Sequence, residues 1–171
     1  MRIVTSKSLD VLLRCYSTYI VPIIEFASSV WSPFLLLESK KLETVQHLFT
    51  RLVYYRCFPD RGYPRSMPSY ESRCKTLKLH SLAYRRVVSD LVMGFKILRS
   101  LCIVKFSNFF RIRVCSGRRG SFSFYVDQTK KNFRNYCFAL RTARWFNMLS
   151  ANDSSIFYCH LLELLSMYEI F

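Results

Sequence analysis

The residue types best suited to chemistry in this sequence are the arginines and lysines of its C-terminal half, and that chemistry is the binding of phosphate. A guanidinium group offers several donors in one plane, which fits the oxygens of a phosphate. On a helix predicted from Asn132 to Leu149, the arginines at 134, 141 and 144 fall within about 80° of one another and form a row. The candidate nucleic-acid-binding residues are Arg111, Arg113, Arg118, Arg119, Lys130, Lys131, Arg134, Arg141 and Arg144.

Aromatic side chains accompany these arginines. Beside the arginine row runs an apolar stripe made of Phe133, Tyr136, Leu140 and Ala143. Near the first four arginines stand Phe122, Phe124 and Tyr125. Arginine together with aromatic rings is suited to holding a nucleic-acid backbone and stacking on exposed bases. The alternative is that the aromatics form the core and the arginines are merely solvated. We favour the core for the aromatics and phosphate binding for the arginine row.

The net charge is concentrated in the same region. The chain has 26 Lys and Arg against 11 Asp and Glu, a net charge of +15. Between Arg99 and Arg144 there are 11 basic residues and one acid, Asp127, so 46 residues carry +10. Such a density repels itself unless a polyanion neutralises it, and nucleic acid is the commonest intracellular candidate. The alternative is a solvated basic face that keeps an aromatic-rich protein soluble.

Patterns typical of catalysis are missing from the sequence. The four glycines, at 62, 94, 117 and 120, make no phosphate loop, and the three histidines have no acid at a catalytic spacing. The acids are scattered singly, whereas two-metal chemistry needs clustered carboxylates. The seven cysteines show no C-x-x-C spacing, and we interpret them as small buried hydrophobic residues. We therefore expect no metal, no cofactor and no autonomous enzymatic activity.

Composition places the chain among ordinary folded proteins. It is 51% hydrophobic and 16% aromatic, which excludes an intrinsically disordered chain. The longest uncharged stretches, 15–24 and 26–37, are shorter than the roughly 20 apolar residues of a membrane-spanning helix, so we expect no membrane. No signal peptide is visible at Met1, and we expect an intracellular protein, nuclear or cytoplasmic.

Hydrophobic periodicity predicts mostly helices. The first runs from Leu9 to Trp31 with a kink at Pro22. The second runs from about Glu38 to Arg56, and a loop follows it between Cys57 and Pro68. The apolar face of this second helix is expected to hold Leu42, Val45, Leu48, Phe49, Leu52 and Val53. Two more are predicted after the N-cap candidates Ser69 and Ser81, over 70–77 and 82–99. Alternation over 111–114 and 121–126, around a turn at 116–120, predicts a β-hairpin. Helices over 132–149 and 154–170 complete the chain.

One run of the chain, from Tyr16 to Pro33, reads YSTYIVPIIEFASSVWSP, and shorter runs follow it. They are LETVQHLFTR from Leu42, YESRCKTLKLHSL from Tyr70, YRRVVSDLVMGFKIL from Tyr84, and pieces between Phe109 and Asn147. In this order they resemble the blocks Y-x-x-Y-V-R-P-I-L-E-Y-A-S-x-V-W-x-P, L-E-x-V-Q-R-x-F-T-R, Y-E-x-R-L-x-x-L-x-L-x-S-L, x-R-R-x-x-x-D-L-x-x-x-Y-K-I-L and F-F … R-x-x-F-F-x-x-R … W-N-x-L-P. These are blocks of non-LTR (LINE-type) retrotransposon reverse transcriptases of the jockey and chicken-repeat kind.

The resemblance implies a thumb and the segment after it, which hold the template–primer duplex and the target. It implies a mainly α fold, with a helical thumb-like bundle over 1–100. A basic post-thumb region over 101–171 would then hold a small β-hairpin and two C-terminal helices. The family's metal-binding Asp pair and endonuclease lie upstream of these blocks, so the resemblance implies no polymerisation by these residues. Three positions depart from the family: Val21 replaces an arginine, Phe146 is inserted, and Ser150 replaces a proline.

We therefore expect a non-catalytic fragment of an RNA-directed DNA polymerase. It would bind template–primer or target nucleic acid, RNA or DNA, without sequence specificity. One alternative is a host-recruited helical module that binds a protein partner, or itself, through an uncovered first helix. Another is a genomic relic without selected function.

Overall fold

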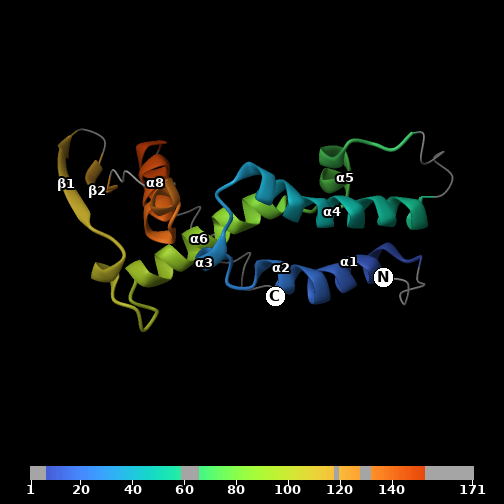
Figure 1. The fold of residues 1–171 in the computed structure, drawn as a ribbon, viewed down its shortest axis with the longest axis horizontal. Helices are drawn as coiled ribbons and strands as arrows, with labels where there is room; N and C mark the ends of the chain where they lie inside the picture. The colour runs from blue at the N-terminus through green and yellow to red at the C-terminus, as the bar shows by residue number, and fades with distance from the viewer. Residues whose placement is uncertain (1–6, 59–65, 118–119, 128–131, 153–171) are drawn as a thin grey trace. The chain divides into compact units, whose positions relative to one another are not determined.

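A computed structural model of the chain describes residues 7–58, 66–117, 120–127 and 132–152 (Figure 1). The fold is mainly helical with one two-stranded antiparallel hairpin, which confirms the expected class. The helix expected over 154–170 lies outside the described residues, and so does most of the loop expected between Cys57 and Pro68. Among the described residues, no helix combines the length and apolar character needed to span a bilayer.

The chain divides into two compact units, Met1–Arg86 and Val87–Phe171. The boundary expected from the sequence lies after residue 100, whereas the structure has it inside helix α6 (Leu82–Leu98). The reason is that Leu91, Phe95 and Ile97, in the second part of α6, belong to the hydrophobic core of the second unit. The two units are described separately below.

In the first unit, the helix expected over 9–31 is interrupted. It consists of α1 (Leu9–Cys15), the π-helix η1 (Tyr16–Ile20), α2 (Val21–Glu25) and α3 (Ser28–Trp31). The wide π turn ends at Ile20, two residues before Pro22, whose backbone nitrogen lacks the N–H that a regular helix would use. Ala27 then adopts a left-handed backbone with φ 51°, which separates α2 from α3.

The rest of the first unit agrees more closely with expectation. Helix α4 (Leu36–Cys57) matches the second predicted helix, and α5 (Tyr70–Thr76) matches the short one. Ser69 caps α5 by accepting a hydrogen bond from the Ser72 amide at 3.2 Å. Helices α1 and α4 are in contact and enclose the core of this unit, which comprises Leu12, Tyr16, Val21, Phe49, Val53, Tyr54 and Leu77 (Figure 1).

The buried face of α4 differs from its predicted apolar stripe. Gln46 and Thr50 are fully buried beside Phe49 and Val53, whereas Leu48, which we expected on that face, is exposed. A buried polar side chain requires hydrogen-bond partners, and both Gln46 and Thr50 have them, as described below. The hydrogen bonds therefore compensate for burying two polar residues on the face of α4 that meets the core.

The second unit contains the later part of α6, η3 (Phe106–Asn108), strands β1 (Ile112–Gly117) and β2 (Gly120–Phe124), and helices α7 (Asn132–Asn135) and α8 (Phe138–Asn152). Its core comprises Leu91, Phe95, Ile97, Phe110, Phe124, Ala143 and Phe146. Gly94 lets α8 approach α6 closely, because a Cβ there would lie 2.5 Å from Thr142 Cγ2 and 2.9 Å from Phe146 Cε2.

Candidate nucleic-acid interface

The pairing of strands β1 and β2 determines which side chain of the hairpin enters the core. Ile112 pairs with Phe124 and Arg113 with Ser123, and the Tyr125 amide donates to the Arg111 carbonyl at 2.8 Å. Because side chains alternate along a strand, Phe124 enters the core while the side chains on either side of it face outward. We call the set Arg111, Arg113, Ser123 and Tyr125 the hairpin outer face. Both arginines are exposed, and so is Tyr125.

Asn147 of α8 fixes the hairpin in place. Its side-chain amide donates to the Phe124 carbonyl at 2.8 Å, and its Oδ1 accepts from the Phe124 amide at 2.8 Å. Phe124 and Ile112 form a non-hydrogen-bonded pair of the ladder, in which the amide and carbonyl of Phe124 point away from β1. Asn147 binds these two groups as a third strand would. In the sequence, Asn147 is recognisable only as one residue of a motif. Only a long-range contact, 23 residues apart, reveals its function.

The arginine row expected on one helix is interrupted in the structure. Helix is absent at Tyr136 and Cys137, so Arg134 belongs to α7 while Arg141 and Arg144 belong to α8. Asparagine, tyrosine and cysteine are weak helix formers, and Asn135, Tyr136 and Cys137 follow one another here. The expected continuous helix over 132–149 is therefore wrong.

Arg141 is engaged within the protein. Its Nε donates to Asp90 Oδ2 at 2.7 Å and its Nη2 to Oδ1 at 3.0 Å, while Nη1 donates to the Tyr136 carbonyl at 2.6 Å. The Asp90 side chain is 2% exposed and that of Arg141 16%. A buried bidentate pair of this kind joins α6 to α8 and leaves Arg141 poorly placed for a phosphate. Its position thus differs from the solvent-facing row expected from the sequence.

The remaining candidate cations fall into two groups. Arg111, Arg113 and Arg134 are exposed, and so is Arg144, although its guanidinium also donates to the Asn135 carbonyl at 2.9 Å. Arg118, Arg119, Lys130 and Lys131 lie outside the described residues.

The described part of the second unit carries far more positive than negative charge. Apart from the Asp90–Arg141 pair it contains a single acid, Asp127, which is half-buried. The exposed cations number seven: Lys96, Arg99, Lys105, Arg111, Arg113, Arg134 and Arg144. Lys96, Arg99 and Lys105 were not among the sequence candidates. Arg99 and Lys105 belong to the excess of basic residues between positions 99 and 144, so that excess was the sequence signal that could have identified them.

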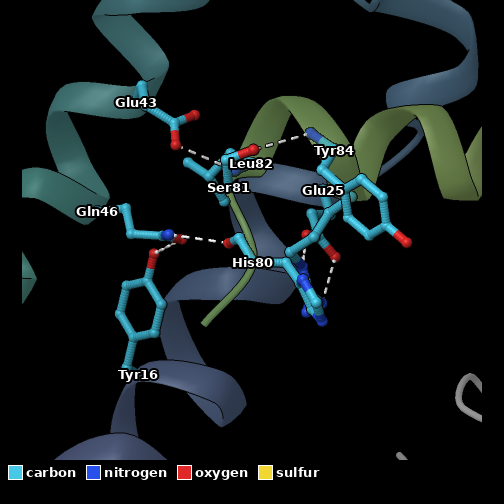
Figure 2. Close-up of polar contacts among 9 residues, drawn as sticks. Tyr16, Glu25, Glu43, Gln46, His80, Ser81, Leu82 and Tyr84 are labelled. Atoms are coloured by element: carbon cyan, nitrogen blue, oxygen red, sulfur yellow. Dashed lines mark hydrogen bonds and ion pairs between the residues drawn. The ribbon is translucent and has the colours of Figure 1, made fainter. Parts of the chain in front are cut away.

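The first unit holds a network of buried polar contacts. Figure 2 shows the Tyr16 hydroxyl directed at Gln46, whose amide reaches the backbone of His80. The two distances are 3.0 Å from Tyr16 Oη to Gln46 Oε1 and 2.9 Å from Gln46 Nε2 to the His80 carbonyl. Nearby, Glu43 Oε1 accepts from the Tyr70 hydroxyl at 2.5 Å and from the Leu82 amide at 3.2 Å.

Further contacts extend this network around the start of α6. Ser81 caps the helix by accepting from the Tyr84 amide at 3.2 Å, as predicted (Figure 2). Arg85 pairs with Glu25 through both carboxylate oxygens. Arg73, which is also buried, donates from Nε to Thr50 Oγ1 at 3.2 Å. Apart from the Ser81 cap, each contact joins segments far apart in the chain, so the network fastens the unit together.

Burial shifts the pKa values of Tyr16, Tyr70 and His47 in the first unit. Desolvation raises the pKa of the Tyr16 phenol, and the charge of Glu43 raises it further. Desolvation raises the pKa of Tyr70 as well, with its hydrogen bond to Glu43 adding to the effect. Desolvation lowers the pKa of His47, and the charges of Arg73 and Arg51 lower it further. At neutral pH both phenols are therefore protonated donors and His47 is neutral.

The cysteines only partly follow the expectation of burial. Cys74 is buried, but Cys137 is exposed because it lies in the turn between α7 and α8. Within the described ranges, no group of three or more histidine, cysteine, aspartate and glutamate side chains is placed to hold a metal ion.

Comparison with known proteins gives no relative: no family model matches the chain, and neither does any curated protein or solved structure.

Proposed function

We propose that this chain binds the backbone of nucleic acid without sequence specificity, as the thumb and post-thumb segment of a non-LTR retrotransposon reverse transcriptase. The observation that carries the binding is the exposure of seven cations against one half-buried acid in the described part of the second unit. A nucleic acid can neutralise such an excess of exposed positive charge, because it carries phosphates repeatedly along one ligand. The proposal assigns this segment a holding role and no chemical step.

The ancestry is supported by how the motif residues are used. Tyr16 contacts Gln46, Glu43 contacts Tyr70, and Thr50 contacts Arg73. Each of these side chains stands where the sequence matches a letter of the family motifs, and each contact joins two different blocks. The same is true of the pairs Glu25–Arg85 and Asp90–Arg141. A set of blocks that evolved to fold together accounts for this pairing.

The test is the salt dependence of binding. The full chain is titrated against a fluorescently labelled DNA duplex between about 50 and 200 mM salt. If about 4–6 phosphates are engaged, the slope of log K against log salt is expected to be roughly −4 to −5. Absence of binding at about 50 mM salt would remove the proposal.

A matched pair of variants locates the surface. Arg111→Gln with Arg134→Gln is expected to reduce the magnitude of the salt slope by about 2, since each lost phosphate contact reduces it by about 1. The control, Lys40→Gln with Lys75→Gln, removes two exposed lysines of the first unit and the same charge. Equal effects of the two variants would show that net charge, and not this surface, accounts for binding.

A second candidate function rests on the exposed apolar side chains of the first unit. Ile23, Phe26 and Leu36 are exposed, and Val30 is 86% exposed. These four residues are close together in the sequence, and exposed apolar side chains that adjoin one another mark protein-interaction sites, which suits a helical module that binds a partner or itself. Gel filtration of the nuclease-treated chain tests it: an oligomer that persists in high salt and dissociates on Val30→Glu would favour this function.

A further inference from the structure

Among the described residues of the second unit, Tyr125 is exposed, as Phe109 and Tyr136 also are. Phe110, Phe124 and Phe146 are buried in the core, whereas Tyr125 is 49% exposed. This exposure follows from the alternation of side chains along a strand. Core packing and the hydrogen bonds of Asn147 hold Phe124 inward, so the next side chain faces outward. An aromatic ring is thus presented to solvent on a fixed strand end.

Two arginines lie across from this position, on the β1 side of the hairpin. The hydrogen bond from the Tyr125 amide to the Arg111 carbonyl makes these residues directly opposite neighbours. The register of Arg113 with Ser123 places Arg113 diagonally across from Tyr125. Opposite Cβ atoms in such a pair are about 5 Å apart and diagonal neighbours about 7–8 Å, within reach of long side chains. Both arginine side chains therefore start on the same face of the hairpin as the ring, close enough for a single ligand to reach all three residues.

We infer that the hairpin outer face is a stacking site for an unpaired base of single-stranded nucleic acid, an inference that rests on the proposed function. The base stacks on the Tyr125 ring, and the flanking phosphates contact Arg111 and Arg113. A single strand is the ligand because a base exposes its flat face only when unpaired, and aromatic rings bind that face whatever the sequence. The excess of cations over acids on this unit complements the phosphates of such a strand.

The test separates stacking from phosphate binding without changing the protein. The full chain is titrated by fluorescence anisotropy with a labelled oligothymidylate of about 20 nucleotides and with an abasic oligomer of equal length and charge. Stacking of one base is expected to make the oligothymidylate bind about 5- to 150-fold more tightly, the ratio that corresponds to 1–3 kcal/mol. Equal binding of the two oligomers would overturn the inference and leave the proposed function standing. Failure of both oligomers to bind would also overturn the inference, and the duplex titration would then decide whether the proposed function stands.

Variants then assign the stacking to one ring. Tyr125→Ala is expected to abolish the preference for oligothymidylate while leaving the affinity for the abasic oligomer unchanged. Tyr125→Phe keeps a ring and is expected to keep the preference. The matched control is Tyr55→Ala, which removes a tyrosine of the first unit that is 47% exposed. If Tyr125→Ala retains the preference, or weakens binding of both oligomers equally, the stacking site does not lie at this residue.

Discussion

Asp90 and Arg141 make a buried ion pair in the second unit, and replacing either residue with alanine is expected to destabilise the fold without weakening phosphate binding. Two hydrogen bonds of 2.7 and 3.0 Å join the carboxylate to the guanidinium, and the Asp90 side chain is almost inaccessible to water. Removing one partner leaves a charge in a poorly solvated position, which typically costs about 3–5 kcal/mol. Each single variant should lose stability of this order.

The double variant provides the internal check. Once Asp90 is gone, the loss of Arg141 removes an interaction that no longer exists, so the two effects should not add. The sum of the single effects is expected to exceed the effect of the double variant by about 2–3 kcal/mol. Urea unfolding of the full chain, followed by far-ultraviolet circular dichroism, measures all three free energies of unfolding.

Binding of a DNA duplex distinguishes the structural role of Arg141 from the phosphate-binding role that the sequence predicted for it. Arg134→Ala should reduce the magnitude of the salt slope by about 1, and Arg141→Ala should leave it unchanged, because Arg141 is held by Asp90. The reasoning is refuted if Asp90→Ala costs less than about 1 kcal/mol. It is also refuted if Arg141→Ala changes the slope as much as Arg134→Ala does.

Three further changes test other parts of the structure. Asn147→Ala leaves the amide and carbonyl of Phe124 without a partner and should cost about 2–4 kcal/mol in urea unfolding; a cost below about 1 kcal/mol would mean that water replaces the amide. Gly94→Ala should destabilise by about 1–2 kcal/mol, since crowding against Thr142 outweighs the better helix propensity of alanine; a stabilised variant would contradict this packing. The lowered pKa of His47 means that the unfolded chain binds this proton more readily, so the free energy of unfolding should fall as the pH drops through about 6.5. Urea midpoints at about pH 7.5 and 5.5 should differ less in His47→Gln than in the parent chain, and an equal difference would exclude His47 as a source.

The sequence correctly predicted those features that depend only on residues a few positions apart. The caps at Ser69 and Ser81 and the alternation of the hairpin each depend on residues within a few positions, and the structure has all three. Helix α4 was also predicted, because its periodic stretch is long and free of proline and glycine.

Long-range pairing accounts for what the sequence did not reveal. Periodicity favoured Leu48 for the buried face of α4, but Gln46 is buried instead because Tyr16 and the His80 carbonyl bind it. Likewise, a projection around one helix placed Arg141 in a solvent-facing row, while its position in the structure is set by an acid 51 residues earlier. Hydrophobic patterns do not encode such pairings.

The side chain of Asn147 also has a consequence for association between copies of the chain. The edge of a two-stranded sheet usually presents unpaired amides and carbonyls that can form hydrogen bonds with a strand of another molecule. At Phe124 those groups already have a partner, so a foreign strand would have to displace an intramolecular amide before it could add there. One asparagine therefore shields this stretch of β2 from templated aggregation, a protection that an all-apolar contact between α8 and the hairpin would not provide.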